Sequence, residues 1–134
     1  MVNKTRIATN AAPPATGTYS QAIRTGDLVF VTAQTGRNPE TGKLEDGLEA
    51  QTRRMFSNID AILNAAGCSA ADIVKVTLLL KDIKDFKAVD VIYSAWLPGL
   101  GVTPLPTRTA FQAAALPAGA LVMMDVIAAY PHDQ

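Results

Sequence analysis

Two charged residues interrupt stretches of the sequence that otherwise look buried, Arg108 in PTRTAF and Asp125 in LVMMDVIAA. Charged side chains are almost never fully buried unless they are paired. A structural salt bridge or a solvent-facing strand position would explain both residues without any function. If both line a small cleft instead, the guanidinium can bind a carboxylate through two hydrogen bonds, and the aspartate can hold and deprotonate a water molecule. The residues alone leave these explanations equally open.

Histidine and cysteine chemistry has almost no residues to draw on. His132 is the only histidine and stands close to the end of the sequence, and Cys68 is the only cysteine. A Ser-His-Asp or Cys-His arrangement and a zinc or iron site are therefore disfavoured. We expect Cys68 to be a bystander, because nothing around it indicates an activated thiol. With no glycine-rich phosphate-binding motif present, an enzyme of this sequence would work with Arg, Asp, Glu, Tyr, Ser, Thr and water.

Tyr19 and Thr32 are weaker candidates for a site. A tyrosine after Gly17 and a threonine in VTAQTG are most simply ordinary loop and strand residues. Thr32 draws attention only because TAQTG ends a hydrophobic strand, where backbone amides and hydroxyls become accessible to a ligand.

Two amphipathic helices must position these residues. The apolar residues of segment 46–66 recur at helical spacing, and Gly67 is the expected C-terminal stop. This stripe consists of Leu48, Met55, Phe56, Ile59, Ile62 and Leu63, with Gln51, Arg54, Asn58 and Asp60 largely off it. Asp85 is a good N-cap for a second helix that ends at Pro98-Gly99. The apolar face of that helix consists of Phe86, Val89, Tyr93, Trp96 and Leu97.

Five strands are expected around these helices. SQAIR and LVFVTAQ flank a glycine-containing turn at residues 25–27 and predict a hairpin, and segments 73–82, 107–116 and 121–130 have strand character. We expect a mixed sheet with antiparallel opening and closing pairs and both helices on one face. The uncovered face carries apolar residues, so neighbouring subunits are expected to cover it.

Composition narrows the possible partners. The 134 residues form one expected domain of 14.2 kDa, in which 12 Lys and Arg balance 12 Asp and Glu. A zero net charge disfavours electrostatic binding to nucleic acid or to an anionic membrane. Apolar residues make up 49% and charged residues only 18%, which again favours a homo-oligomer. With one cysteine, no signal-peptide core and no run of 18 apolar residues, we expect a cytoplasmic protein.

Four segments resemble the reactive-intermediate deaminase family, also called RidA, YjgF or L-PSP endoribonuclease. They are ATGTYSQAI, VTAQTGRNPETG, NIDAILNAAGCSAADIVKVTLLLKDIKDF and PTRTAFQAAALPAGALVMMDVIAAY, and the resemblance extends over residues 7–129. It implies an α+β, chorismate-mutase-like subunit with a six-stranded mixed sheet and two helices on one face. It also implies a homotrimer with a central sheet barrel and a cleft between each pair of subunits.

The resemblance implies roles for named residues. Arg108 would bind the carboxylate of a 2-imino or 2-enamino acid, Tyr19 would pack against the substrate, and Asp125 would orient or activate water. The chain differs from the family pattern at four positions: Thr32 replaces serine, Ala110 replaces cysteine, Asp90 replaces asparagine, and Asp125 replaces glutamate. The shorter Asp125 would shift a bound water by about 1.5 Å, which affects rate or substrate preference. Asp90 would repel an anionic substrate if it reached a neighbouring cleft.

The implied activity is hydrolysis of reactive imines and enamines, such as 2-aminoacrylate and its imine tautomer, to a 2-oxo acid and ammonia without a cofactor or metal. A protonated imine is already electrophilic, so the protein needs to hold the carboxylate and place one water. Two alternatives remain open: a non-catalytic trimer that binds small carboxylates, and the ribonuclease or translation inhibitor that the family's older name records.

Overall fold

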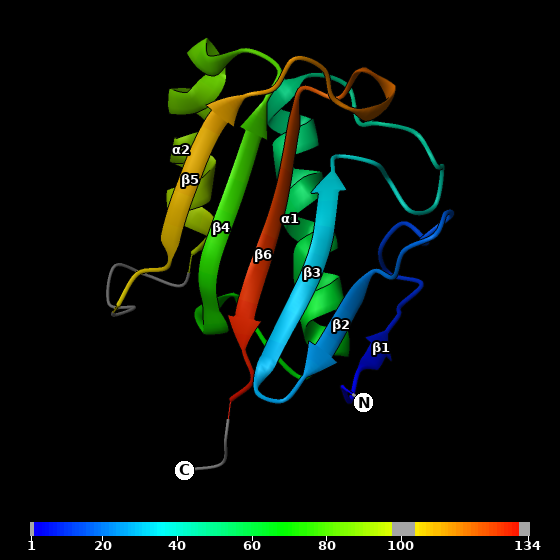
Figure 1. Ribbon diagram of the computed structural model, residues 1–134. Helices are drawn as coiled ribbons and strands as arrows, with labels where there is room; N and C mark the ends of the chain where they lie inside the picture. Colours follow the sequence, from blue (N-terminus) through cyan, green and yellow to red (C-terminus); the bar gives the residue numbers. More distant parts are fainter. Residues whose placement is uncertain (1, 98–103, 132–134) are drawn as a thin grey trace.

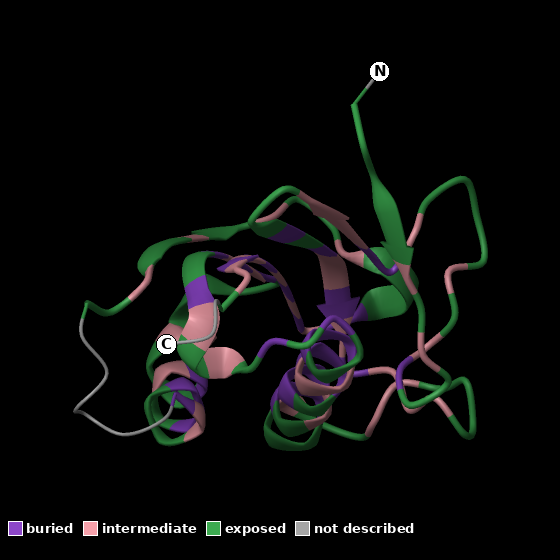
Figure 2. Cartoon of the chain, turned by 90° about the horizontal axis from the view of Figure 1, so that it is seen from below, coloured by how far each residue is buried: buried purple, intermediate pink, exposed green. Residues whose placement is uncertain are grey.

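Six strands form one mixed sheet, and both long helices lie on the same side of it (Figures 1 and 2). The structure is a computed structural model that describes residues 2–97 and 104–131. The strands are β1 (Thr5–Ile7), β2 (Ala22–Thr25), β3 (Leu28–Thr35), β4 (Ile73–Leu80), β5 (Thr107–Gln112) and β6 (Val122–Ala129), and the helices are α1 (Leu48–Ala65) and α2 (Phe86–Trp96). Short 3-10 turns lie at Ala70–Asp72, Ile83–Asp85 and Pro117–Gly119. The mixed sheet with two helices on one face confirms the expected fold class.

The strand order is β1-β2-β3-β6-β4-β5. β4 and β5 are parallel because α2 forms the crossover between them, and the other neighbouring pairs are antiparallel. The predicted opening hairpin is present as β2 and β3, but the predicted antiparallel pairing of the last two strands is wrong. β6 lies between β3 and β4 instead of beside β5. β6 is apolar along its length except at Asp125, and a long apolar strand is unfavourable at a sheet edge, where its unpaired N–H and C=O groups would invite aggregation.

The hydrophobic core fills the space between the sheet and the two helices. Alternate residues of β4 and β6 are buried on the helix side of the sheet, and α1 packs against β3 and β6. The predicted apolar stripe of α1 faces them: Met55, Phe56, Ile59, Ile62 and Leu63 are buried, and Leu48 packs at the margin. Between the helices, the Phe56 and Trp96 rings stack 4.5 Å apart, and the Trp96 indole donates to Asp60 at 3.0 Å. The two helices therefore form one layer with a shared aromatic contact.

Gln51 and Asn58 were expected off the buried stripe of α1, and this prediction is wrong. Both side chains are buried because they bond to backbone groups of adjacent loops and strands. The Gln51 amide donates to the Glu45 carbonyl at 3.1 Å and accepts from the Leu121 N–H at 2.9 Å. The Asn58 amide donates to the carbonyls of Thr35 and Arg37 at 3.2 and 2.9 Å. The donors of both amides and the oxygen of Gln51 are satisfied within the protein, whereas the buried Oδ1 of Asn58 has no hydrogen-bond partner among the described residues.

The ends of the elements differ from the predicted limits by a few residues. Gly67 has a φ of +82° directly after α1, which confirms it as the left-handed stop. Asp85 stands at the N-cap position of α2, although its side chain makes no capping hydrogen bond. β5 ends at Gln112 rather than at 116, and the predicted stop at Pro98-Gly99 lies outside the described residues. The short β1 had no recognisable sequence pattern of its own.

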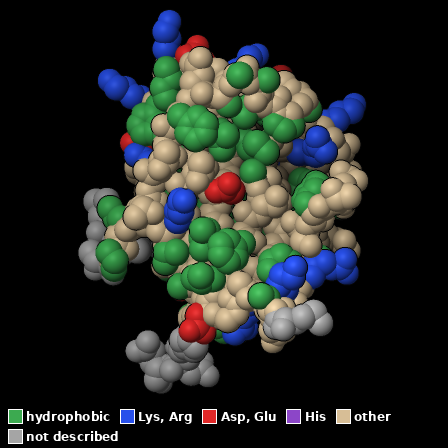
Figure 3. All heavy atoms as spheres, in the orientation of Figure 1, with side chains coloured by type: hydrophobic (Ala, Val, Ile, Leu, Met, Phe, Trp, Pro, Cys, Tyr) green, Lys and Arg blue, Asp and Glu red, His purple; other side chains and the backbone are tan. Residues whose placement is uncertain are grey.

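The sheet face opposite the helices is open and largely apolar. Leu28 and Phe30 of β3 are 40% and 41% exposed, and Phe111 of β5 is 45% exposed. Figure 3 shows hydrophobic side chains over much of this face, with few charges among them. In the part of the chain that the structure describes, no helix is long and apolar enough to cross a membrane.

Replacing Leu78 by Ala should strongly destabilise the fold. Leu78 lies in a central strand and is fully buried, so the truncation leaves a cavity that costs about 2–5 kcal/mol. The matched control is Val91→Ala on α2, where the side chain is 72% exposed and the cost should stay within about 0.5 kcal/mol. Urea unfolding at one protein concentration measures both, and equal losses would contradict the assigned core.

Candidate functional site

Arg108 lies on the helix-covered side of the edge strand β5. It pairs in register with the buried Val76 of β4, and α2 crosses over it. Its guanidinium donates to the Asp90 carboxylate at 2.7 Å, and its carbon atom lies 5.0 Å from the Phe86 ring centroid and 4.8 Å from that of Tyr93. The Arg108 side chain is 28% exposed. The Asp90 carboxylate and the two aromatic rings therefore hold the Arg108 guanidinium at the margin of the core.

A hollow of about 380 Å³ opens beside this guanidinium. It is lined by Asp90, Tyr93, Ser94, Leu97, Leu105, Pro106 and Arg108. Burial raises the pKa of the Tyr93 phenol above its ordinary value, and the nearby Arg108 offsets part of this rise. The hollow thus combines one ion pair, a neutral phenol and an apolar wall, a composition typical of small-molecule sites.

Asp125 lies on the other face of the sheet. Thr77 of β4 pairs with Asp125 on one side and with Thr109 on the other, so these three side chains share the open face. Asp125 is half-buried, and its side chain has no hydrogen-bond or ion-pair partner among the described residues. A carboxylate in this position is available to a water molecule or to a second chain.

Side-chain alternation separates Arg108 from Asp125. Because Thr109 faces the same side as Asp125, its neighbour Arg108 must face the opposite side. Within one chain the two residues therefore do not line a common cleft, and a cleft that contains both would need residues of two subunits. The pairing of Arg108 with Asp90 shows that the structural salt bridge also considered from the sequence does exist.

Thr32 lies beside Asp125 at an irregularity in β3. The register with β6 shifts between Val31 and Gln34, so two strand residues lie opposite the position of Asp125. The Thr32 N–H donates to the Gln21 carbonyl at 2.9 Å, and the side chain is half-buried. A bulge of this kind redirects side chains and frees backbone groups, which is common next to binding sites.

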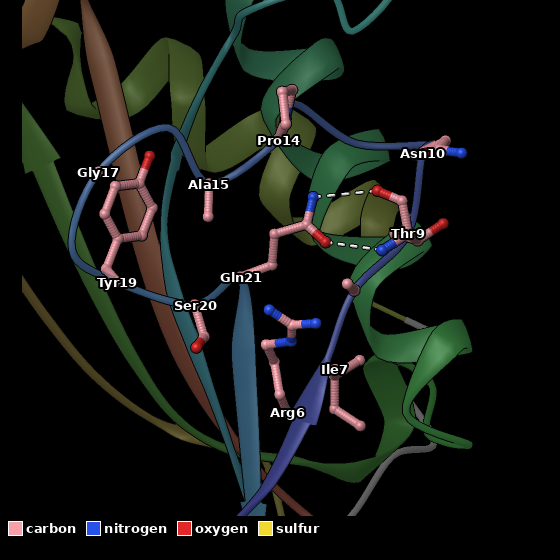
Figure 4. Close-up of a pocket in the computed structure, with 11 residues that line it drawn as sticks. Arg6, Ile7, Thr9, Asn10, Pro14, Ala15, Gly17, Tyr19, Ser20 and Gln21 are labelled. Atoms are coloured by element: carbon pink, nitrogen blue, oxygen red, sulfur yellow. Dashed lines mark hydrogen bonds between the residues drawn. The ribbon is translucent and has the colours of Figure 1, made fainter.

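Tyr19 lies in the loop between β1 and β2 and is 52% exposed. A Cβ at Gly17 would lie 3.2 Å from its ring, so glycine allows the loop to fold closely around the tyrosine. Tyr19 lines a hollow of about 440 Å³ together with Ser20 (Figure 4). It also lines a smaller hollow with Ala33 and Met123, and Met123 shares the face of Asp125. Tyr19 therefore belongs to the same side of the sheet as Thr32 and Asp125.

Ala110 lies near Arg108. It follows Arg108 by two residues on β5, so both side chains face α2. It lines a hollow of about 420 Å³ with Ile83, Lys84, Phe86 and Lys87. The six candidate residues thus form two groups: Asp90, Arg108 and Ala110 beside α2, and Tyr19, Thr32 and Asp125 toward the open face.

Gln21 is a positioning residue that the sequence did not reveal. It is buried, and its amide accepts from the Thr9 N–H at 2.7 Å and donates to the Thr9 carbonyl at 3.0 Å (Figure 4). The same amide also donates to the Pro13 carbonyl at 2.7 Å. These bonds hold the loop that carries Tyr19. A polar residue at the start of an apolar strand was the one available signal, and it did not distinguish a buried amide from an exposed one.

Among the residues that the structure describes, Cys68 and the carboxylates form no further reactive group. Burial raises the pKa of the buried Cys68 thiol, and the charge of Asp72 raises it further, which agrees with the expected bystander. Across residues 2–97 and 104–131, no three His, Cys, Asp or Glu side chains come together in a way that could hold a metal ion. His132 lies outside the described residues.

Comparison with known sequences gives one family. Residues 9–130 match the family model described as Endoribonuclease L-PSP. Reactive Intermediate Deaminase A, chloroplastic, of Arabidopsis thaliana is 41% identical over 128 residues, which are 95% of this chain and 66% of that protein. The 2-iminobutanoate/2-iminopropanoate deaminase of Rattus norvegicus is 40% identical over 123 residues, which are 91% of this chain and 87% of that protein.

Comparison with solved structures gives the same fold. RidA from an Antarctic Psychrobacter has a TM-score of 0.87 and 42% identity, with 93% of this chain and 98% of that one covered. TdcF of E. coli with bound serine has a TM-score of 0.89 and 33% identity, with 95% and 99% covered.

Tyr93 should make the fold sensitive to alkali. Because burial raises the pKa of Tyr93, the folded state favours the neutral phenol, and this contribution to stability is lost as the pH rises above the value of the unfolded chain. Between about pH 9 and about pH 11, the melting temperature of the wild type should fall more steeply than that of Tyr93→Phe. Parallel slopes for the two proteins would contradict the assignment.

Proposed function

Since the chain belongs to the endoribonuclease L-PSP family, we propose that it is a deaminase that hydrolyses short 2-imino and 2-enamino acids to 2-oxo acids and ammonia. Two observations on relatives support this: the rat protein is named for 2-iminobutanoate and 2-iminopropanoate, and an E. coli relative of the same fold holds serine. All of these molecules are small α-substituted carboxylic acids.

The observation that carries the proposal is the position of Arg108. Its guanidinium opens onto a hollow of about 380 Å³ that suits a small acid, and the Phe86 and Tyr93 rings lie beside it. Asp90 occupies one Nη1–H, which leaves donors of the planar fork for a substrate carboxylate. Arg108 would therefore bind the carboxylate and fix the orientation of the C=N bond, and Ala110 would leave space beside it.

Asp125 is the proposed acceptor of a proton from water. In the hydrolysis, the water oxygen bonds to the imine carbon while its proton passes to Asp125. Asp125 returns that proton to the nitrogen and then accepts the proton of the newly formed hydroxyl, so that the C=O bond forms as the C–N bond breaks. Ammonia takes this last proton from Asp125, and ammonium and the 2-oxo acid leave. General base catalysis of this type contributes roughly 100- to 10,000-fold, and it requires no metal or cofactor. Thr32 and Tyr19 would line the side of the cleft from which water approaches.

The separation of the two residue groups supports a site shared between subunits. Arg108 and Asp125 face opposite sides of their own sheet, so a complete site needs Arg108 and Ala110 of one copy opposite Tyr19, Thr32 and Asp125 of another. The open face, with Phe30 and Phe111 partly exposed, would be covered in the same assembly. We propose a homotrimer with its sheets around a central barrel and three such clefts, located in the cytoplasm.

Arg108→Ala should lower kcat/KM at least about 100-fold, because the substrate loses its orienting contact. The assay follows pyruvate and ammonia after 2-aminoacrylate is generated in solution. Arg53→Ala is the matched control, since Arg53 is an exposed arginine in an ion pair on α1, and it should leave the rate unchanged. Asp125→Asn should lower kcat by roughly 100-fold or more.

A rate that does not exceed the uncatalysed reaction, or one that survives Arg108→Ala, would overturn the proposed deaminase. Binding of the product without turnover would favour the carboxylate-binding trimer instead. Cleavage of RNA by protein purified free of ribonuclease, with no deamination, would favour the nuclease.

The oligomeric state can be tested separately. Light scattering should give a mass about three times the 14.2 kDa of the chain. Phe30→Asp places a charge on the open face and should reduce this mass, whereas Val91→Asp on the exposed side of α2 should not. A monomeric wild type would contradict the proposed shared site.

A further inference from the structure

The hollow beside Arg108 is lined by a negatively charged side chain as well as by a positively charged one. Asp90 and Arg108 both line it, and they present a negative oxygen and a positive nitrogen 2.7 Å apart. Their side chains are 38% and 28% exposed, so solvent screens the pair less than a fully exposed one. Within the described residues, Arg108 is the one ion-pair partner of Asp90. A ligand that reaches the guanidinium therefore also meets the Asp90 carboxylate.

We propose that Asp90 is a specificity-determining residue that makes this site prefer zwitterionic ligands, meaning small acids with a protonated imine or amine next to the carboxylate, over plain carboxylates. This inference rests on the proposed function and specifies the charge state in which the substrate binds.

The argument is one of matching charges. In a 2-iminium or 2-ammonium acid, the nitrogen and the nearer carboxylate oxygen lie roughly 3 Å apart, since they are separated by three bonds. This spacing is close to that of Arg108 Nη1 and Asp90 Oδ1. A zwitterion lying antiparallel to the ion pair places its carboxylate on Arg108 and its cationic nitrogen on Asp90, so each charge faces an opposite one.

A ligand that carries only a carboxylate has no cationic nitrogen to face Asp90. It must share the guanidinium with Asp90, and the two anions repel each other at close range. The rest of the wall supplies no further cation among its described residues: Ser94 and Tyr93 are uncharged, and Leu97, Leu105 and Pro106 are apolar. The apolar side would contact the short aliphatic chain of either ligand equally.

The preference should weaken the binding of the product relative to the substrate. The protonated imine is a zwitterion when it binds, and the 2-oxo acid has lost the cationic nitrogen when ammonia leaves. Asp90 attracts the first and repels the second, so the product should bind more weakly than the substrate. The same residue would bind the electrophilic form of the imine, which is the form that water attacks.

Two four-carbon ligands that differ in charge can test whether Asp90 sets this preference. Isothermal titration of 2-aminobutyrate, a zwitterion, and 2-oxobutyrate, an anion, into the wild type and Asp90→Asn gives the ratio of the two affinities. Asparagine keeps the shape of the side chain and removes the charge. We expect the ratio to move by roughly tenfold toward the oxo acid, with the amino acid bound more weakly and the oxo acid more tightly.

Glu49→Gln is the matched control, because it removes one carboxylate from an exposed ion pair on α1 and so changes the net charge equally. It should leave the affinity ratio unchanged. Arg108→Ala should weaken both ligands. In turnover assays, inhibition by 2-oxobutyrate should strengthen in Asp90→Asn by a similar factor.

A parallel loss of both affinities in Asp90→Asn would assign a purely structural role to Asp90 and overturn the inference. An unchanged ratio, or a wild type that binds neither ligand, would also overturn it. These results are distinct from failure of the proposed function, which the release of pyruvate and ammonia and its dependence on Arg108 decide. A protein that binds with the expected ratio but does not turn over would keep the inference and lose the deaminase.

Discussion

The alternation of side chains along a single sheet is the constraint on which the rest of the structure depends. Because consecutive residues of a strand face opposite sides, the same six strands build a buried core under α1 and α2 and leave an apolar face open. The alternation also places the polar residues of the candidate site on two opposite faces of the sheet. Arg108 goes to the helix side with Asp90, and Asp125 goes to the open side with Thr77 and Thr109. One subunit therefore holds two incomplete halves of a site.

Much of this architecture follows from the sequence, because it depends on local periodicity. The apolar stripe of α1, the stop at Gly67 and the strand character of β4 and β6 each have a pattern within a few residues. The order of the strands in the sheet does not follow from the sequence in this way. The insertion of β6 between β3 and β4 depends on contacts between segments some 40 to 100 residues apart, and such contacts leave no trace in local periodicity or residue propensity. β1 is too short to show a pattern at all.

The candidate site was predictable in its residue types and less so in its geometry. Arg108 and Asp125 stood out because a charge in an apolar strand needs a partner. Which partner each has depends on the face of the sheet, and that is fixed by register with neighbouring strands. The burial of Gln51, Asn58 and Gln21 was missed for a related reason. Their amide groups bond to backbone groups of adjacent loops and strands, and no local sequence pattern indicates such bonds.

The stacked pair of Phe56 and Trp96 has a spectroscopic consequence. Trp96 is the only tryptophan in the chain, so the indole emission of the folded protein has one source, located where α1 meets α2. Its ring centroid lies 6.0 Å from that of Tyr93, which in turn contacts the Arg108 guanidinium. The single tryptophan is thus separated from the proposed carboxylate-binding Arg108 by one side chain, that of Tyr93. Its fluorescence emission should therefore change when the packing between α1 and α2 changes, and no added label is needed.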